Sequence, residues 1–147
     1  MEWQTRRMSD YRILKVWQKA HALALSSHRT ATRIRGQDHV ALRSQVIRSA
    51  MSVPANIVEG REQKSEAAFA RYLRIAMGSA SELEYHLLAA RDIGAISGSE
   101  HLSLQSQVTE VRMMLYGLVR RLESNDAPPR ASTAALPSTA QPNRPRS

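Results

Sequence analysis

Basic side chains in the first half of the sequence have the types and spacing needed to bind phosphate groups. Residues 11–58 contain eight lysines and arginines but one acidic residue, Asp38, in a chain of formal net charge +8. In the first helical segment these cations point about 140° away from the apolar stripe and form one outward ridge. We predict that this basic ridge, extended by two arginines of the second segment, contacts nucleic-acid phosphates. Its residues are Arg12, Lys15, Lys19, Arg29, Arg33, Arg43 and Arg48.

The spacing within the basic ridge is unfavourable for an ordinary solvent-exposed helix face. Lys15 and Lys19 are four residues apart, as are Arg29 and Arg33. Like charges at this spacing repel, whereas opposite charges would stabilise the helix. Residues 59–123 are nearly neutral, so the positive charge is concentrated on one half of the chain. The alternative is an arginine-rich surface that has no specific ligand.

Groupings of side chains that perform catalysis or bind metals are missing from the sequence. Its five histidines include no H-x-x-x-H or H-E-x-x-H pair, and it has no cysteine;. Glu82 and Glu84 are two residues apart, so on a helix they point about 200° away from each other. Nucleotide-binding glycine loops and G-x-S-x-G elbows are also missing. We therefore predict a noncatalytic protein that needs no metal and no cofactor.

Four amphipathic segments must position the basic ridge. Glycines at 36, 60, 94 and 98 interrupt the apolar periodicity, and each is expected to end a helix or separate two helices;. The first helix is predicted over 11–35, and the later ones begin at Asp38, at Ser65 and at a capping box formed by Ser97 and Glu100. No segment shows a sustained alternation typical of a strand. The fold class is therefore all-α, an antiparallel up-down-up-down four-helix bundle.

Apolar residues at steps of three and four define the inward face of each segment. The inward face of the first segment is formed by Ile13, Trp17, Ala20, Ala24, Ser27, Ala31 and Ile34. The second has Leu42, Val46, Ala50, Val53 and Ile57. The third has Phe69, Leu73, Ala76, Ala80, Leu83, Leu87 and Ala90. The fourth has Leu104, Val108, Val111, Leu115, Leu118 and Leu122.

A proline within the second segment is the most unusual local feature. Pro54 removes one helical hydrogen bond, and its ring approaches the carbonyl of Ala50, so we predict a kink there. Asn56 and Glu59 follow near the helix end, where they could bind backbone groups of a neighbouring helix. Two small residues complete the expected structural motif: Gly60 ends the helix, and Gly78 (with Ser79 and Gly117) allows close contact between helices.

The two ends of the chain lie outside the predicted bundle, which covers 11–123. Residues 1–10 are expected to form a flexible extension. Residues 124–147 hold five of the six prolines and one large aliphatic residue, Leu136, so a disordered, basic tail is expected;. No stretch is long and apolar enough for a membrane span, and no signal sequence is evident. We expect a cytoplasmic protein that does not contact membranes.

Several strings in this sequence resemble a bacterial four-helix-bundle family, first recognised as proteins encoded by intervening sequences within 23S rRNA genes. The resemblance covers about 11–123, and its most specific part is S-V-P-A-N-I-x-E-G at 52–60. It is carried by Leu14-Lys15-Val16-Trp17, Ser52-Val53-Pro54-Ala55-Asn56-Ile57 with Glu59-Gly60, Leu73-Arg74-Ile75-Ala76 with Gly78-Ser79 and Glu82-Leu83-Glu84, and Ala90-Arg91-Asp92-Ile93-Gly94.

The resemblance implies an assembly and a set of partners. The family includes proteins similar to the accessory variability determinant of diversity-generating retroelements, a basic pentameric barrel that partners a reverse transcriptase and contacts nucleic acid. By this resemblance the chain would form a homopentamer, lack catalysis and bind RNA or an RNA-handling partner. Excess apolar surface independently suggests a subunit interface. Its candidate residues are Ala76, Ala80, Ala90, Met113, Met114 and Tyr116.

Three functions therefore remain open from the sequence. The first is a noncatalytic, oligomeric module that binds the backbone of RNA or DNA through the basic ridge. The second is a homopentameric protein-interaction scaffold, such as a reverse-transcriptase accessory protein. The third is an intervening-sequence product with no defined role.

Overall fold

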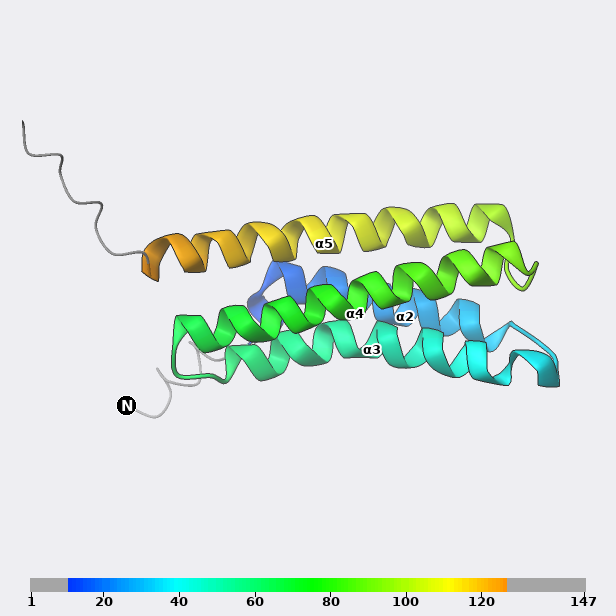
Figure 1. The fold of residues 1–147 in the computed structure, drawn as a ribbon, viewed down its shortest axis with the longest axis horizontal. Helices are drawn as coiled ribbons and strands as arrows, with labels where there is room; N and C mark the ends of the chain where they lie inside the picture. The colour runs from blue at the N-terminus through cyan, green and yellow to red at the C-terminus, as the bar shows by residue number, and fades with distance from the viewer. Residues whose placement is uncertain (1–10, 127–147) are drawn as a thin grey trace, which may run out of the picture.

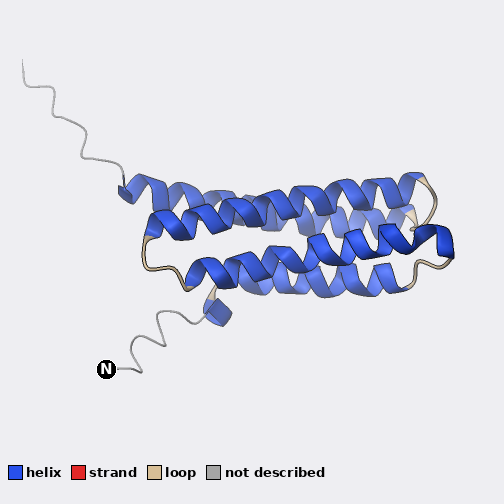
Figure 2. Ribbon diagram, turned by 60° about the horizontal axis from the view of Figure 1, so that its bottom comes forward, coloured by secondary structure: helices blue, strands red, loops and turns tan. Residues whose placement is uncertain are grey.

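Four long helices form the structure, a computed structural model that describes residues 11–126. Two short 3-10 helices, η1 and η2, precede α2 and α3, and the described part contains no strand (Figure 2). The bounds are η1 Tyr11–Ile13, α2 Lys15–Thr32, η2 Gln37–His39, α3 Val40–Arg61, α4 Glu66–Asp92 and α5 Gly98–Asp126. The predicted all-α, four-helix bundle is confirmed.

Successive helices run in opposite directions along the length of the bundle (Figure 1). Side-chain pairs between α2 and α5 show the same arrangement. Lys19 near the start of α2 pairs with Glu110, whereas Arg33 just beyond its end pairs with Glu100 near the start of α5. The seam between α2 and α5 therefore closes the ring of four helices, and it brings the basic ridge beside α5.

Local signals in the sequence explain where α4 and α5 begin. The Ser65 hydroxyl accepts a hydrogen bond from the Ala68 N–H at 3.1 Å, and the Ser97 hydroxyl accepts one from the Glu100 N–H, also at 3.1 Å. Both are N-caps, which satisfy donors of the first helical turn. Gly94, with a φ of 79°, ends α4 as Ala95 N–H reaches back to the Ala90 carbonyl at 2.8 Å. This is the Schellman arrangement that favours glycine.

Three predicted helix boundaries are wrong. The first helix begins at Lys15 rather than at residue 11, because Leu14 is extended with φ −74° and ψ 121°. Asp38 lies in η2 and does not cap α3, whose N-cap position is His39. Gly60 does not end α3, which continues to Arg61, and the φ of Gly60 is not positive.

The core follows the predicted stripes closely on α4 and less closely on α2. All seven predicted residues of α4 are buried, including Ala76, Ala80 and Ala90, which are fully buried within one subunit and so do not form a subunit interface. On α2, Val16 and Leu23 occupy core positions that the sequence prediction left out. Trp17 is only half-buried because its ring packs against Tyr11 and His21 instead, with centroids 5.0 and 4.9 Å apart.

The proline motif of α3 makes one polar link to α4. The helix runs without interruption across the buried Pro54. The link itself joins the hydroxyls of Ser52 and Ser79 at 2.8 Å. Asn56 donates to the Ser52 carbonyl at 2.8 Å, so it stabilises its own helix rather than a neighbouring one. The Glu59 side chain is exposed. The expected bonds from Asn56 and Glu59 to a neighbouring helix are therefore replaced by the serine pair.

Close helix contact occurs at Gly60, for which it was not predicted, and not at Gly78 or Gly117, for which it was. A Cβ at Gly60 would lie 2.8 Å from the Cβ of Tyr72 and 3.0 Å from the Phe69 ring, so α3 and α4 touch there. A Cβ at Gly78 or Gly117 would meet no heavy atom within 4 Å, apart from those of its own helix turn. The prediction for Gly78 is therefore wrong within a single subunit.

The ends of the chain are only partly described. Helix α5 continues to Asp126, past the predicted boundary at residue 123. The predicted flexible extension at 1–10 and the remainder of the predicted tail, 127–147, lie outside the described residues. None of the helices in residues 11–126 has the combination of length and apolar character that a membrane span requires.

Candidate nucleic-acid interface

Six of the seven residues of the basic ridge have exposed side chains. Arg12 lies on η1, four others lie on or just after α2, and Arg48 lies on α3. None of these six points into the core, since each is exposed to solvent. The exposed members are Arg12, Lys15, Lys19, Arg29, Arg33 and Arg48.

Carboxylates of α5 partly neutralise the ridge, which the sequence analysis did not anticipate. Lys19 Nζ lies 3.2 Å from Glu110 Oε1, and an Arg33 guanidinium nitrogen lies 3.6 Å from Glu100 Oε2. Both pairs are solvent-exposed, and such pairs contribute about 0–1 kcal/mol. A phosphate could therefore displace either carboxylate at little cost. The sequence does contain a signal for these pairs, because Glu100 and Glu110 both lie on the polar face of the segment that forms α5.

Arg43 has a structural role that limits its availability. One guanidinium nitrogen donates to the carbonyls of Ile34 and Gly36 at 2.8 and 3.0 Å. These carbonyls belong to the link after α2, where Gly36 has a φ of 102°. Arg43 therefore holds the α2–α3 connection, and only its Nη2 and Nε groups are left for a ligand;.

Three members of the ridge have no anionic or hydrogen-bonding partner in residues 11–126: Lys15, Arg29 and Arg48. Lys15 and Arg29 lie at opposite ends of α2, and each lines a cavity along the α2–α5 seam. Arg48 is on α3 and lines neither cavity. The structure thus brings the α2 cations into one row beside α5 and leaves Arg48 apart from these cavities.

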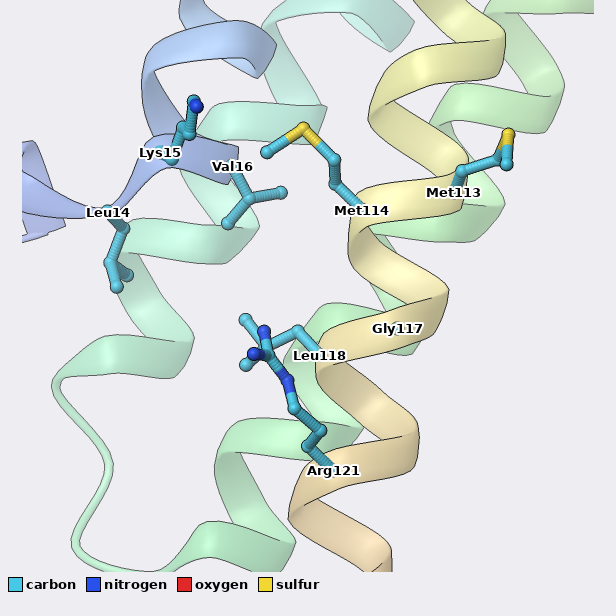
Figure 3. Close-up of a pocket in the computed structure, with 8 residues that line it drawn as sticks. All are labelled: Leu14, Lys15, Val16, Met113, Met114, Gly117, Leu118 and Arg121. Atoms are coloured by element: carbon cyan, nitrogen blue, oxygen red, sulfur yellow. The ribbon is translucent and has the colours of Figure 1, made fainter.

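The contact between α2 and α5 is the sparsest among neighbouring helices of the bundle, and two cavities open along it. The larger, about 480 Å³, has an apolar floor that includes Val16, Met114 and Leu118. Lys15 and Arg121 stand at this cavity (Figure 3). Figure 3 shows Met114 extending from α5 toward Val16. Arg121 thus adds a cation from α5 that the sequence analysis did not assign to the interface.

The second cavity, about 360 Å³, lies at the other end of the seam, next to the start of α5. Its walls carry Arg29 and Arg33 from the α2 side, together with hydroxyl groups from both helices. The two arginines could be identified from the sequence, but these hydroxyls could not. The arginines and hydroxyls come together only because α2 packs against α5. The sequence of neither helix by itself shows that these two helices pack together.

No grouping of three or more histidine and carboxylate side chains suited to a metal ion occurs in the described part of the chain. Glu84 pairs with Arg112 at 2.6 Å, whereas Glu82 lines a shallow hollow beside Tyr85. His101 is buried, and neither of its ring nitrogens has a hydrogen-bond partner within residues 11–126.

Comparisons with known proteins agree with this fold. The family described as 23S rRNA-intervening sequence protein matches residues 12–117. The chain is also similar to a crystal structure of a protein with unknown function from the S23 ribosomal protein family of Bacteroides thetaiotaomicron VPI-5482. The two are 26% identical with a TM-score of 0.68, over 71% of this chain and 98% of that chain. No curated protein matches the sequence.

Proposed function

This chain belongs to the family of 23S rRNA-intervening sequence proteins, and on that premise we propose that it is a noncatalytic, oligomeric module that binds the backbone of nucleic acid, with RNA as the expected ligand. The observation that carries this proposal is the row of exposed cations on α2, which faces an open seam. Lysines and arginines that contact phosphates position a nucleic acid without reading its bases. We therefore expect recognition of RNA shape and charge rather than of a sequence.

The ion pairs of the seam are compatible with this role. Lys19 and Arg33 each face one carboxylate, and both pairs are exposed to solvent. Arg29 and Lys15 face none within the described residues. The carboxylates hold the side chains of Lys19 and Arg33 along the seam, and binding exchanges a weak pair for a contact with a more highly charged polymer.

Salt dependence tests the proposal. For single-stranded RNA the slope of log K against log salt is about −0.7 per phosphate neutralised, and for duplexes about −0.9. If Lys15, Arg29 and Arg48 alone contact phosphates, the slope is about −2 to −3 for each subunit bound. If all seven ridge residues do so, it is about −5 to −6. Filter binding at several salt concentrations measures it, and a slope near zero would contradict the proposal.

A homopentameric interaction scaffold is the second candidate, and the outer face of α4 and α5 favours it. Tyr85, Met113 and Tyr116 are 65%, 70% and 54% exposed. A groove of about 330 Å³ between these helices is lined by Met77, Met113 and Tyr116. Exposed apolar side chains around a groove are typical of protein interfaces. In this role the chain would assemble with itself and dock an RNA-handling enzyme such as a reverse transcriptase.

Light scattering tests the self-assembly. We expect the wild-type chain to have the mass of a pentamer and Met113→Glu to have a lower mass, because burying a charged carboxylate in an apolar subunit interface is unfavourable. Ala67→Glu, at an exposed position in the first turn of α4, introduces the same charge and should keep the wild-type mass;. A monomeric wild-type protein would exclude the scaffold, and a Met113→Glu protein that remained pentameric would place the interface elsewhere.

A further inference from the structure

The smaller cavity of the α2–α5 seam has an unusual concentration of groups that bind anions. It holds about 360 Å³ between the end of α2 and the first turns of α5. Arg29, Arg33 and Thr30 line one side, and Ser99 and Ser103 line the other. Guanidinium and hydroxyl groups are the side chains that most often contact phosphate oxygens.

The hydroxyl of Thr30 gives the first of two observations that point to a ligand. Its residue is 6% exposed, it lines the cavity, and its hydroxyl has no hydrogen-bond partner in the described part of the chain. Other helical threonines of this protein bond to their own helix: Thr32 to the Arg29 carbonyl and Thr109 to the Gln105 carbonyl, both at 2.9 Å. The Thr30 hydroxyl is therefore free to donate a hydrogen bond to an oxygen of a bound phosphate;.

The start of α5 supplies the second observation. The Ser97 hydroxyl and carbonyl accept from the N–H groups of Glu100 and His101. The N–H groups of Gly98 and Ser99 have no acceptor within residues 11–126. Free N–H groups and the dipole of a long helix attract an anion. The N–H groups of Gly98 and Ser99 lie next to the cavity, because Ser99 lines it.

The charges around the cavity favour an anion and include one competitor. Arg29 has no carboxylate partner, and it lies four residues before Arg33 on the same face, where the two cations repel each other;. Glu100 Oε2 lies 3.6 Å from Arg33, while its other oxygen accepts from the Ser97 hydroxyl at 3.3 Å. A bound anion would relieve the repulsion and would displace Glu100 from Arg33.

We propose that this cavity is a binding site for one phosphate group, held by Arg29, Arg33, the Thr30 hydroxyl and the first N–H groups of α5. In the proposed function the phosphate belongs to an RNA backbone, and the inference rests on that function to this extent. A free phosphate ester has the same chemistry and would use the same groups.

An NMR titration with inorganic phosphate tests the site without any nucleic acid. At constant ionic strength, we expect saturable changes in the amide signals of Thr30, Ser99 and Ser103. Arg29→Gln should weaken phosphate binding about tenfold and Thr30→Val about threefold or more, because each removes one bond to the anion. Glu100→Gln should strengthen it by a similar factor, since it removes the competing carboxylate.

One variant serves as a control, and another is a second test of the site. Arg35→Gln removes one exposed cation from the link after α2, outside the cavity lining, and should bind phosphate like the wild type. Ser103→Ala removes a hydroxyl from an exposed lining residue and should weaken phosphate binding, so it tests the site if Thr30→Val fails to fold. Equal affinities for Arg29→Gln, Glu100→Gln and Arg35→Gln, or no saturable change with phosphate, would overturn the proposed site.

A parallel titration with a short single-stranded RNA separates the two sources of phosphate. If RNA and inorganic phosphate both shift the same amides, the site holds an RNA phosphate. If phosphate binds and RNA does not, the site stands as one for a free phosphate ester and the proposed function fails. If RNA binds but the cavity variants behave like Arg35→Gln, the proposed function stands and the site is wrong.

Discussion

A variant in which Lys15, Arg29 and Arg48 are all replaced by glutamate should bind RNA at least a hundredfold more weakly than the wild type at about 0.1 M salt. These are the ridge residues without a partner in the described structure, so they are free to contact phosphates. Each substitution removes an attraction and adds a repulsion, and both act on every phosphate nearby. The affinity would be measured by filter binding, with circular dichroism to show that the bundle is intact.

The choice of these three residues follows from the ion pairs of the seam. Replacing Lys19 or Arg33 by glutamate would place a carboxylate against Glu110 or Glu100. Such a variant would disturb the contact between α2 and α5, and its loss of binding would have two explanations. Lys15, Arg29 and Arg48 are exposed and make no ion pair in the described part of the chain, so their replacement breaks no bond between α2 and α5.

A charge-matched control separates the ridge from the overall charge. Replacing Lys64, Arg71 and Arg120 by glutamate changes the net charge by the same amount at exposed positions after α3, on α4 and on α5. If the ridge is the binding surface, this control keeps most of its affinity. An equal loss in both variants would mean that RNA responds to net charge alone, and the assignment of the ridge would be wrong.

The residues that pack α4 could be predicted from the sequence because that helix has a single unambiguous stripe. Its apolar residues alternate steps of four and three from Phe69 to Ala90, and all of the predicted ones are buried. Helix α2 offers a wider apolar arc, in which Val16, Trp17 and Leu23 are all large. Periodicity alone could not decide that Trp17 would pack against Tyr11 and His21 rather than enter the core.

The candidate site could be predicted only in part. The excess of cations on the first two helices is visible in the sequence, and the structure places six of the seven on the surface. The carboxylates opposite Lys19 and Arg33, and the hydroxyls around Arg29, come from α5. The positions of these groups depend on the axial register of α5 against α2. Core packing sets that register, and no local sequence pattern encodes it.

Replacement of Gly60 by valine should lower the free energy of unfolding by about 3 kcal/mol, because extra atoms in a packed contact force neighbouring groups apart. A Cβ there would lie 2.8 Å from the Cβ of Tyr72, an atom that cannot move without moving α4. The φ of Gly60 is not positive, so the backbone itself does not require glycine. The loss would therefore come from the contact between α3 and α4.

Alanine at the same and at another glycine provides the matched test by urea denaturation. Gly60→Ala should still destabilise the protein, by about 1–2 kcal/mol, because crowding outweighs the roughly 1 kcal/mol by which alanine favours a helix. Gly78→Ala has the same helix preference but meets no atom of the subunit outside its own helix turn within 4 Å, so it should stabilise the folded chain;. If both variants were stabilised equally, α3 and α4 would not be in contact at Gly60. If the stability of Gly78→Ala instead fell more steeply on dilution than that of the wild type, a second subunit would contact α4 at that glycine. That result would favour the scaffold.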